Sequence, residues 1–169
     1  GWNWVSFSVI PADNSLENML ASYGPQDSDE FKTATNLGGS ATYFGGQWFG
    51  IEGGIQPGVM YLLKKQAAGA AQIVVNGEAV VVNTPINLVQ GWNWIGFTGQ
   101  NTTPLATALA DYISNVATDG DELKTSTNLG GTATYFGGQW FGLGGGIVPG
   151  VGYKLRVQTA SPGDLIFAE

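Results

Sequence analysis

Apolar and polar residues alternate along short stretches of this chain, and glycine-rich turns separate the stretches. In residues 2–7, WNWVSF, apolar side chains fall on both faces of a period-two pattern, which is typical of a strand buried on both sides. The same pattern predicts strands at Phe31–Thr35, Ala41–Phe44, Gln47–Ile51, Val59–Lys64, Ala71–Asn76 and Ile86–Val89. The Gly-Gly and Pro-Gly pairs between them indicate turns.

One stretch near the start changes to the helical period. Leu16, Met19, Leu20 and Tyr23 stand at positions i, i+3, i+4 and i+7, so they share one face of a helix. Asn14 is the expected N-cap of this helix, because it precedes the periodic run and has an acidic residue three positions later.

The chain repeats itself. Three segment pairs recur in order: GWNWVSF at 1–7 with GWNWIGF at 91–97, TNLGGSATYFGGQWFG at 35–50 with TNLGGTATYFGGQWFG at 127–142, and PGVMYLLK at 57–64 with PGVGYKLR at 149–156. The offset between the copies is 90 residues at the start and 92 residues from Asp27 onward. Two copies of one module therefore make up the chain.

A second helix is expected at the matching place in the second copy. Thr103 is its expected N-cap, and Pro104 occupies the first helical position, where proline is tolerated. The apolar residues that continue the same phase are Leu105, Ala108, Leu109, Tyr112, Ile113 and Val116. The last two extend the stripe, so this helix is expected to be one turn longer than the first.

A helix after the first strand, with a run of strands behind it, predicts an α+β fold that is mostly β. We expect two tandem pseudo-symmetric modules, residues 1–90 and 91–169. Each would be an antiparallel sheet or small barrel with one short helix after the first strand.

The two copies differ in one segment. Residues 79–90, AVVVNTPINLVQ, follow the first copy and lead directly into the second GWNW, but no such segment precedes the first GWNW. If this strand completes each module, one copy lacks its partner strand, and an unpaired edge of this kind invites pairing with another chain. The alternative is that the chain is a piece of a longer tandem array.

Charge excludes some partners. The net charge is −7 with only six Lys and Arg residues, so the basic face that nucleic acid requires cannot be built. Anionic membrane surfaces are disfavoured for the same reason. No run of about 20 apolar residues is present, so membrane insertion is not expected.

Composition also argues against enzymatic activity. The chain has no cysteine and no histidine, which removes thiol nucleophiles, zinc–thiolate sites and the commonest general base. Only carboxylate, lysine and tyrosine side chains remain for acid–base work, and no constellation of them stands out. We therefore expect a non-enzymatic protein with no cofactor.

The aromatic run in each copy is the main candidate site. Its candidate ligand or interface residues are Tyr43, Gln47, Trp48, Tyr135, Gln139 and Trp140. The tryptophans could stack on sugar rings while the glutamines donate hydrogen bonds. Aromatic residues are also the usual material of cores, and an exposed, weakly charged aromatic patch is typical of a permanent protein interface. The sequence leaves these three interpretations open.

Acidic residues recur at matching positions as well. Asp27, Asp29, Asp119 and Asp121 are candidate calcium ligands, because clustered oxygens in a loop can bind this ion. The EF-hand pattern is absent. The alternative is a solvated turn, in which Lys32 and Lys124 neutralise part of the charge.

The motifs resemble a repeat family. A GWNW opening, a short helix, an aromatic-Gly-Trp stretch and a closing PG-x-x-Y strand are similar to tandem GWNLIS…PGxGY-type modules of secreted, cell-surface and large algal-virus proteins. The resemblance implies a β-rich surface module and carries no catalytic residue.

These observations together predict an extracellular or cell-surface structural or adhesive module, a subunit of a fibre or tandem array. Its expected partners are copies of itself or neighbouring repeats, joined by edge-strand pairing and aromatic contacts. The alternative function is a carbohydrate-binding module in which Trp48 and Trp140 stack on a polysaccharide.

Overall fold

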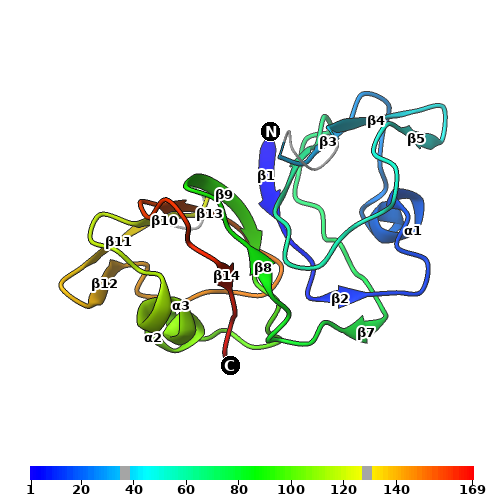
Figure 1. Ribbon diagram of the computed structural model, residues 1–169. Helices are drawn as coiled ribbons and strands as arrows, with labels where there is room; N and C mark the ends of the chain where they lie inside the picture. The colour runs from blue at the N-terminus through cyan, green and yellow to red at the C-terminus, as the bar shows by residue number, and fades with distance from the viewer. Residues whose placement is uncertain (35–38, 127–130) are drawn as a thin grey trace.

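Two five-stranded antiparallel sheets, one from each half of the chain, form the framework of the molecule (Figure 1). They are seen in a computed structural model that describes residues 1–34, 39–126 and 131–169. Short helices pack against each sheet, so the fold is α+β and mostly β, as the sequence predicted. Thr35, the last residue of one predicted strand, and the TNLG segments that open the longest repeat lie outside the described residues.

The first sheet has the strand order β1-β6-β3-β4-β5. These strands are β1 (Trp2–Val5), β6 (Tyr61–Lys64), β3 (Glu30–Lys32), β4 (Ser40–Phe44) and β5 (Gln47–Phe49). Every neighbouring pair is antiparallel, so β1 and β5 form the two edges.

The second sheet repeats this order as β9-β13-β10-β11-β12. Its strands are β9 (Gly91–Gly96), β13 (Gly152–Val157), β10 (Glu122–Lys124), β11 (Thr132–Phe136) and β12 (Gln139–Gly142). The registers also match between copies. Phe31 pairs with Leu63 in the first sheet, for example, and Leu123 pairs with Leu155 in the second.

Two short strand pairs lie outside the sheets. Strand β2 (Val9–Ile10) pairs with β7 (Glu78–Ala79), and β8 (Ile86–Asn87) pairs with β14 (Asp164–Leu165). The predicted strand at residues 71–76 is wrong, because these residues form no strand and pair with none in the described part of the chain. Its counterpart in the second module contains β14, which does have a partner.

The helices begin one residue later than predicted. Helix α1 (Leu16–Leu20) is capped by Ser15, whose hydroxyl accepts a hydrogen bond from the Asn18 amide at 3.4 Å. Asn14 instead forms two hydrogen bonds with Ile55, through its carbonyl oxygen and its side-chain amide, so it is held by the neighbouring loop.

The second helical region is the longer one, as predicted. The first helix continues only through the 3₁₀ turn η1 (Ala21–Tyr23), whereas α2 (Leu105–Ala108) is followed by α3 (Ala110–Asn115). Pro104, not Thr103, is the N-cap of α2. The backbone of Thr103 is hydrogen-bonded to Ile147 in a bridge, which prevents it from capping the helix.

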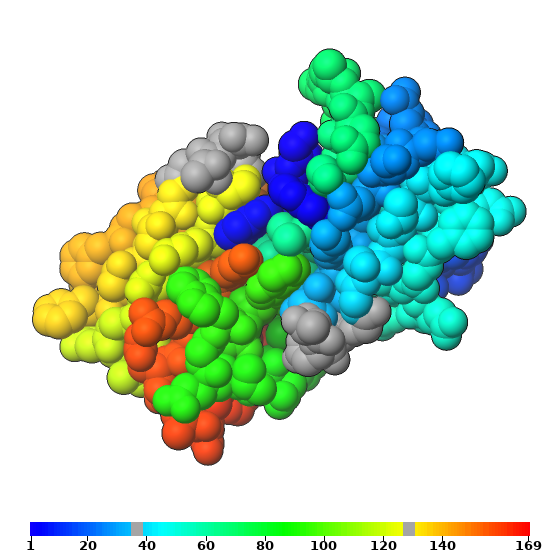
Figure 2. All heavy atoms as spheres, turned by 90° about the horizontal axis from the view of Figure 1, so that it is seen from above, coloured from blue at the N-terminus to red at the C-terminus, as the bar shows by residue number. Residues whose placement is uncertain are grey.

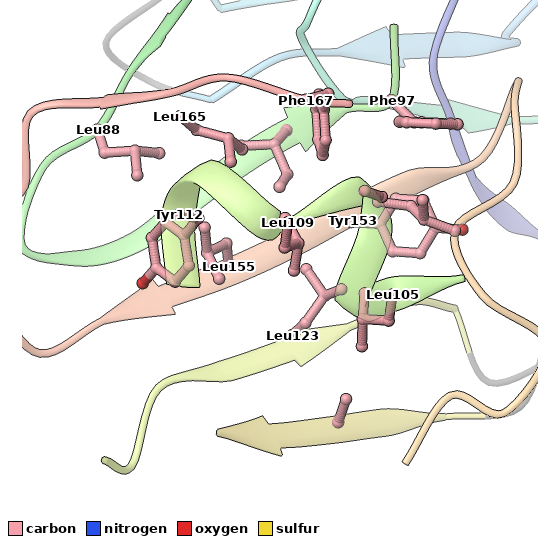
Figure 3. Close-up of a cluster of buried hydrophobic side chains, with 14 of the residues drawn as sticks. Leu88, Phe97, Leu105, Leu109, Tyr112, Leu123, Tyr153, Leu155, Leu165 and Phe167 are labelled. Atoms are coloured by element: carbon pink, nitrogen blue, oxygen red, sulfur yellow. The ribbon is translucent and has the colours of Figure 1, made fainter. Parts of the chain in front are cut away.

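Each helical region covers one face of its sheet and encloses a core. Figure 3 shows the second core, where Leu109 and Tyr112 from the helices meet Leu123 and Leu155 from the sheet. Leu88, which precedes Gly91 in the chain, is also buried in this core. The first core likewise combines aliphatic and aromatic side chains, among them Leu20, Phe31 and Leu63.

The opposite face of each sheet is wet. Trp2 is 39% exposed and Trp92 is 43% exposed, so the expectation that these strands are buried on both sides is wrong. Only the face that carries Asn93 and Ile95 is turned toward the core.

The two modules meet about a pseudo-two-fold axis. The Ser6 amide donates to the Gly150 carbonyl at 3.0 Å, and the Gly96 amide donates to the Gly58 carbonyl at 2.8 Å. Ser6 and Gly96 are equivalent in the repeat, as are Gly58 and Gly150. The same contact is therefore made twice, once in each direction, as two-fold symmetry requires.

Candidate functional site

A β-hairpin at the outer edge of each sheet carries the main candidate residues. The first hairpin joins β4 to β5 through Gly45 and Gly46, whose φ values of 57° and 93° belong to the left-handed region that glycine tolerates. Tyr43 is paired with Trp48, and Phe44 with Gln47. Because side chains alternate along a strand, these two pairs lie on opposite faces of the hairpin.

The inner face of the first hairpin belongs to the core. Trp48 is only 8% exposed, and its ring packs edge-on against Tyr43 and Phe31. The Trp48 indole N–H has no hydrogen-bond partner among the described residues. A ring enclosed in this way presents no free face on which a sugar could stack.

The second hairpin, β11–β12, has the same construction. Trp140 packs 5.4 Å from Tyr135 and 6.3 Å from Tyr112, measured between ring centres, and it is partly buried against the core. Tyr135 itself is buried. Of the six candidate residues in the two hairpins, only Gln47 and Gln139 are exposed.

The outer face of each hairpin presents two phenylalanines instead. Phe44 and Phe49 are 65% and 58% exposed, and Phe136 and Phe141 are 64% and 59% exposed. Each pair lies beside the exposed glutamine of its hairpin, because that glutamine pairs across the strands with the first phenylalanine. We call these two surfaces the phenylalanine patches.

The two phenylalanine patches are far apart. The cyan hairpin of the first module and the orange hairpin of the second lie at opposite ends of the molecule, in Figure 1 and again in the perpendicular view of Figure 2. The folded molecule therefore presents the same apolar surface at two opposite ends.

The sequence left open whether Trp48 and Trp140 belong to the core, to an interface or to a ligand site, and the structure packs both rings against the cores. The period-two pattern already put Trp48 and Phe49 on opposite faces, but it did not reveal which face was wet. The signal that could have settled this is Ala41, which shares the face of Tyr43 in β4. Ser40 and Thr42 share the other face with Phe44, and polar residues at alternate positions indicate the exposed face of a strand.

The repeated aspartates have structural roles. Asp29 is fully buried, and its carboxylate accepts hydrogen bonds from the Tyr23 hydroxyl at 2.9 Å and from the backbone amides of Gln26 and Gln66 at 3.0 and 2.8 Å. Burial, and then this hydrogen bond to Asp29, raise the pKa of Tyr23. The carboxylate thus joins the helical region, the loop before β3 and the end of β6.

Asp121 repeats this arrangement in the second module. It is fully buried and accepts hydrogen bonds from the Tyr112 hydroxyl at 2.6 Å and from the amides of Thr118 and Gln158 at 2.9 and 2.8 Å. Burial, followed by the hydrogen bond to Asp121, raises the pKa of Tyr112. Neither buried aspartate is a solvated turn residue.

The other two aspartates hold the hairpin turns. Asp27 accepts a hydrogen bond from the Gly45 amide at 2.9 Å, and Asp119 accepts one from the Gly137 amide at 2.8 Å. Among residues 1–34, 39–126 and 131–169, no three acidic side chains come together in a metal-binding group. A calcium ion at this loop would have to replace hydrogen bonds that already fix the fold.

A second aromatic surface lies on the wet faces of the sheets. The Lys32 ammonium group lies 4.6 Å from the centre of the Trp2 ring, and Glu30 forms ion pairs of 2.7 Å with both Lys32 and Lys64. These hydrogen bonds, first that of Lys32 and then that of Lys64, lower the pKa of Glu30. The rings are partly covered by cations and remain open to solvent.

The second sheet carries the matching surface. Lys124 lies 4.7 Å from the centre of the Trp92 ring, and Glu122 pairs with Lys124 at 2.8 Å and with Arg156 at 3.1 Å. The apolar pattern of the opening strands predicted buried tryptophans, so this exposed surface is an addition from the structure.

A groove lies along the first module, at its contact with the second. It has a volume of about 860 Å³ and lies between β1, the segment that follows β6, and the Pro149–Gly150 turn of the second module. Asn3 and Ile73 are among its lining residues. The matching space in the second module is occupied by residues of β8 and by Leu88.

No helix in the described part of the chain is both long and apolar enough to cross a membrane. Comparison with protein-family models, with curated proteins and with solved structures finds no significant match to this chain.

Proposed function

We propose that this chain is a non-enzymatic structural or adhesive module of an extracellular or cell-surface assembly, and that it associates with further copies of itself. The observation that carries the proposal is the pair of phenylalanine patches at opposite ends of the molecule. The resemblance of the sequence motifs to tandem surface repeats supports the same function.

The phenylalanine patches have the character of an interface. Four large aromatic side chains, each more than half exposed, lose contact with water when they are covered. Charged residues make up only 11% of the chain, so few charged side chains have to lose water when copies come together. The exposed Gln47 and Gln139 side chains supply polar groups at the rim, as in most protein interfaces.

Open strand edges lie next to these patches. Strands β5 and β12 are the last strands in the order of their sheets, within the part of the chain that the structure describes. An open edge can pair with a strand of another molecule. Because the two ends are equivalent, a contact made at one end leaves the other free to repeat it, and the result is a linear chain of molecules.

Light scattering and negative-stain electron microscopy of the purified chain at rising concentration test this function. The wild type is expected to form filaments or large regular oligomers. Phe44→Ser with Phe49→Ser removes one patch and should stop growth at dimers, as should the matched pair Phe136→Ser with Phe141→Ser. The fourfold variant should be monomeric, and a monomeric wild type at high concentration would refute the proposal.

The wet faces of the sheets favour a second candidate function, carbohydrate binding. Trp2 and Trp92 are partly exposed and lie beside paired acidic and basic side chains. The lysines can donate hydrogen bonds to sugar hydroxyls, and the glutamates can accept hydrogen bonds from them. This candidate moves the proposed stacking rings from Trp48 and Trp140, which pack against the cores, to Trp2 and Trp92.

Glycan screening separates the two functions. Carbohydrate binding predicts that Trp2→Ala and Trp92→Ala fold normally and lose glycan affinity, while the phenylalanine variants keep it. An absence of glycan binding by the wild type, together with filaments, would leave assembly as the function.

A further inference from the structure

The groove of the first module is lined by residues whose repeat counterparts hold β8 and the segment after it in the second module. The relevant lining residues are Asn3, Leu63, Gln66, Ala71 and Ile73. Their counterparts in the repeat are Asn93, Leu155, Gln158, Gly163 and Leu165. The second module therefore shows what this set of residues can bind.

Asn93 grips the backbone of the segment that follows β8. Its side-chain oxygen accepts a hydrogen bond from the Val89 amide at 2.9 Å, and its side-chain nitrogen donates to the Val89 carbonyl at 2.8 Å. Asn93 is only 9% exposed as a result. In the first module, Asn3 is exposed, and within the described ranges its side chain only donates, to the Gly1 and Leu63 carbonyls.

Further contacts hold the same segment along its length. The Leu88 amide donates to the Gly163 carbonyl at 3.1 Å, and the Gln90 side chain donates to the Gln158 carbonyl at 2.8 Å. In the first module the carbonyl groups at the matching positions belong to Ala71 and Gln66, and both residues line the groove.

The apolar contacts are also left incomplete. Leu88 is buried in the second core beside Leu165, which is fully buried. Ile73, the counterpart of Leu165, is only partly buried at the margin of the first core. An apolar side chain at the position of Leu88 would complete the first core in the same way.

The pseudo-two-fold axis extends the match to the module interface. Ile86 of β8 packs so closely on Gly58 that a Cβ atom placed on this glycine would lie 2.8 Å from the Ile86 Cγ1 atom. The equivalent glycine, Gly150, lines the groove, and a Cβ placed there would meet no atom within 4 Å. The space that Ile86 fills on one side of the axis is open on the other.

We propose that this groove is an acceptor site for an extended peptide strand with the sequence pattern of Ile86–Gln90, contributed by another module of the same kind. The inference rests on the proposed assembly function and names the strand that would join one unit to the next. The bound strand would run antiparallel to residues 72–73. Its leucine would enter the first core, and its next residue would be gripped by Asn3.

A synthetic peptide of residues 82–90, VNTPINLVQ, tests the site in solution by NMR. Saturable amide shifts are expected at Ala71, Gln72 and Ile73, together with a shift of the Asn3 side-chain amide. The Leu88→Asp form of the peptide should lose binding, because a carboxylate would then have to enter the core. Asn3→Ala in the protein should weaken binding on the order of tenfold, since about 1.4 kcal/mol corresponds to that factor.

Phe44→Ser is the matched protein control, because it lies on the hairpin and outside the groove, and it should leave peptide affinity unchanged. Shifts confined to Gly163–Leu165 would mean that the peptide only displaces β8, and that outcome overturns the proposal. The absence of any saturable shift also overturns it.

A fused variant gives a second answer without free peptide. Residues 82–90 joined ahead of Gly1 should protect the Ile73 amide from hydrogen exchange, and the same fusion carrying Leu88→Asp should not. Unchanged exchange in the first fusion contradicts the proposal. Peptide binding by a chain that never polymerises would support the acceptor site and refute the assembly function. Polymers without peptide binding would support the assembly function and refute the acceptor site.

Discussion

The ammonium group of Lys154 lies 4.7 Å from the centre of the Trp4 ring, although the two residues belong to different modules. It lies at the same distance from the ring of Trp94 in its own module. Burial lowers the pKa of Lys154. The matching position in the first module is Leu62, so this cation–π bridge between the sheets is made only once.

Lys154→Leu should therefore loosen the contact between modules. The free energy of unfolding is expected to fall by about 1–2 kcal/mol, the usual range for a partly desolvated cation–π contact. Urea unfolding followed by tryptophan fluorescence measures it. Lys124→Leu, at the exposed contact with Trp92, is the control and should cost about 0.5 kcal/mol. Equal losses in both variants would mean that the bridge adds nothing to the module interface.

The tryptophans of the hairpins should behave as core residues. Trp48→Ala and Trp140→Ala are each expected to lower the free energy of unfolding by about 3–5 kcal/mol, because a large ring leaves a cavity. Phe49→Ala and Phe141→Ala remove exposed rings and should change it by about 0.5 kcal/mol or less. Denaturant titration of the four variants in a non-assembling background makes the comparison. A reversed order would show that the faces of the hairpin are misassigned.

The buried tyrosine–aspartate pairs predict a loss of stability in alkali. Because the folded-state pKa of Tyr23 and Tyr112 is raised above the ordinary value of 10.0, the folded state keeps protons that the unfolded state releases above that pH. The contribution of these tyrosines to the free energy of unfolding is complete below pH 10 and declines as the pH rises above 10.

The variant with Tyr23→Phe and Tyr112→Phe isolates this effect. At neutral pH each substitution should cost about 1–2 kcal/mol, because a buried aspartate loses a hydrogen-bond donor. Above pH 10 the difference in stability between this variant and the wild type should shrink. Thermal unfolding at pH 7 to 11 measures the difference, and a gap that stays constant across this range would refute the prediction.

Gly142 should tolerate no side chain. Its φ is 114°, and a Cβ atom placed on it would lie 2.2 Å from the Thr132 carbonyl oxygen. Gly142→Ala is expected to lower the free energy of unfolding by at least about 2 kcal/mol, because both the backbone and the neighbouring strand must move. Gly144→Ala, where the space is open, is the control and should be close to neutral. Circular dichroism during heating compares the two.

Local sequence patterns predicted the start of each helical region to within one residue, and most of the strands. They succeeded where a segment's structure depends on its own side chains, as in the apolar stripe that begins at Leu16. They failed at residues 71–76, because a strand exists only when another strand lies beside it. They also failed on the exposure of Trp2, because period two separates the faces of a strand without saying which one meets the solvent.

The position of β8 has a consequence for how such a protein can be divided. By sequence, Ile86 and Leu88 belong to the tail of the first repeat, but by packing they belong to the second core. The boundary between the sequence repeats therefore differs from the boundary between the folded units. A cut between Gln90 and Gly91 would separate two matching sequences, but it would take β8 away from the second core and leave it unpaired on the first piece. A fragment that starts near Glu78 would carry every strand that the second core uses.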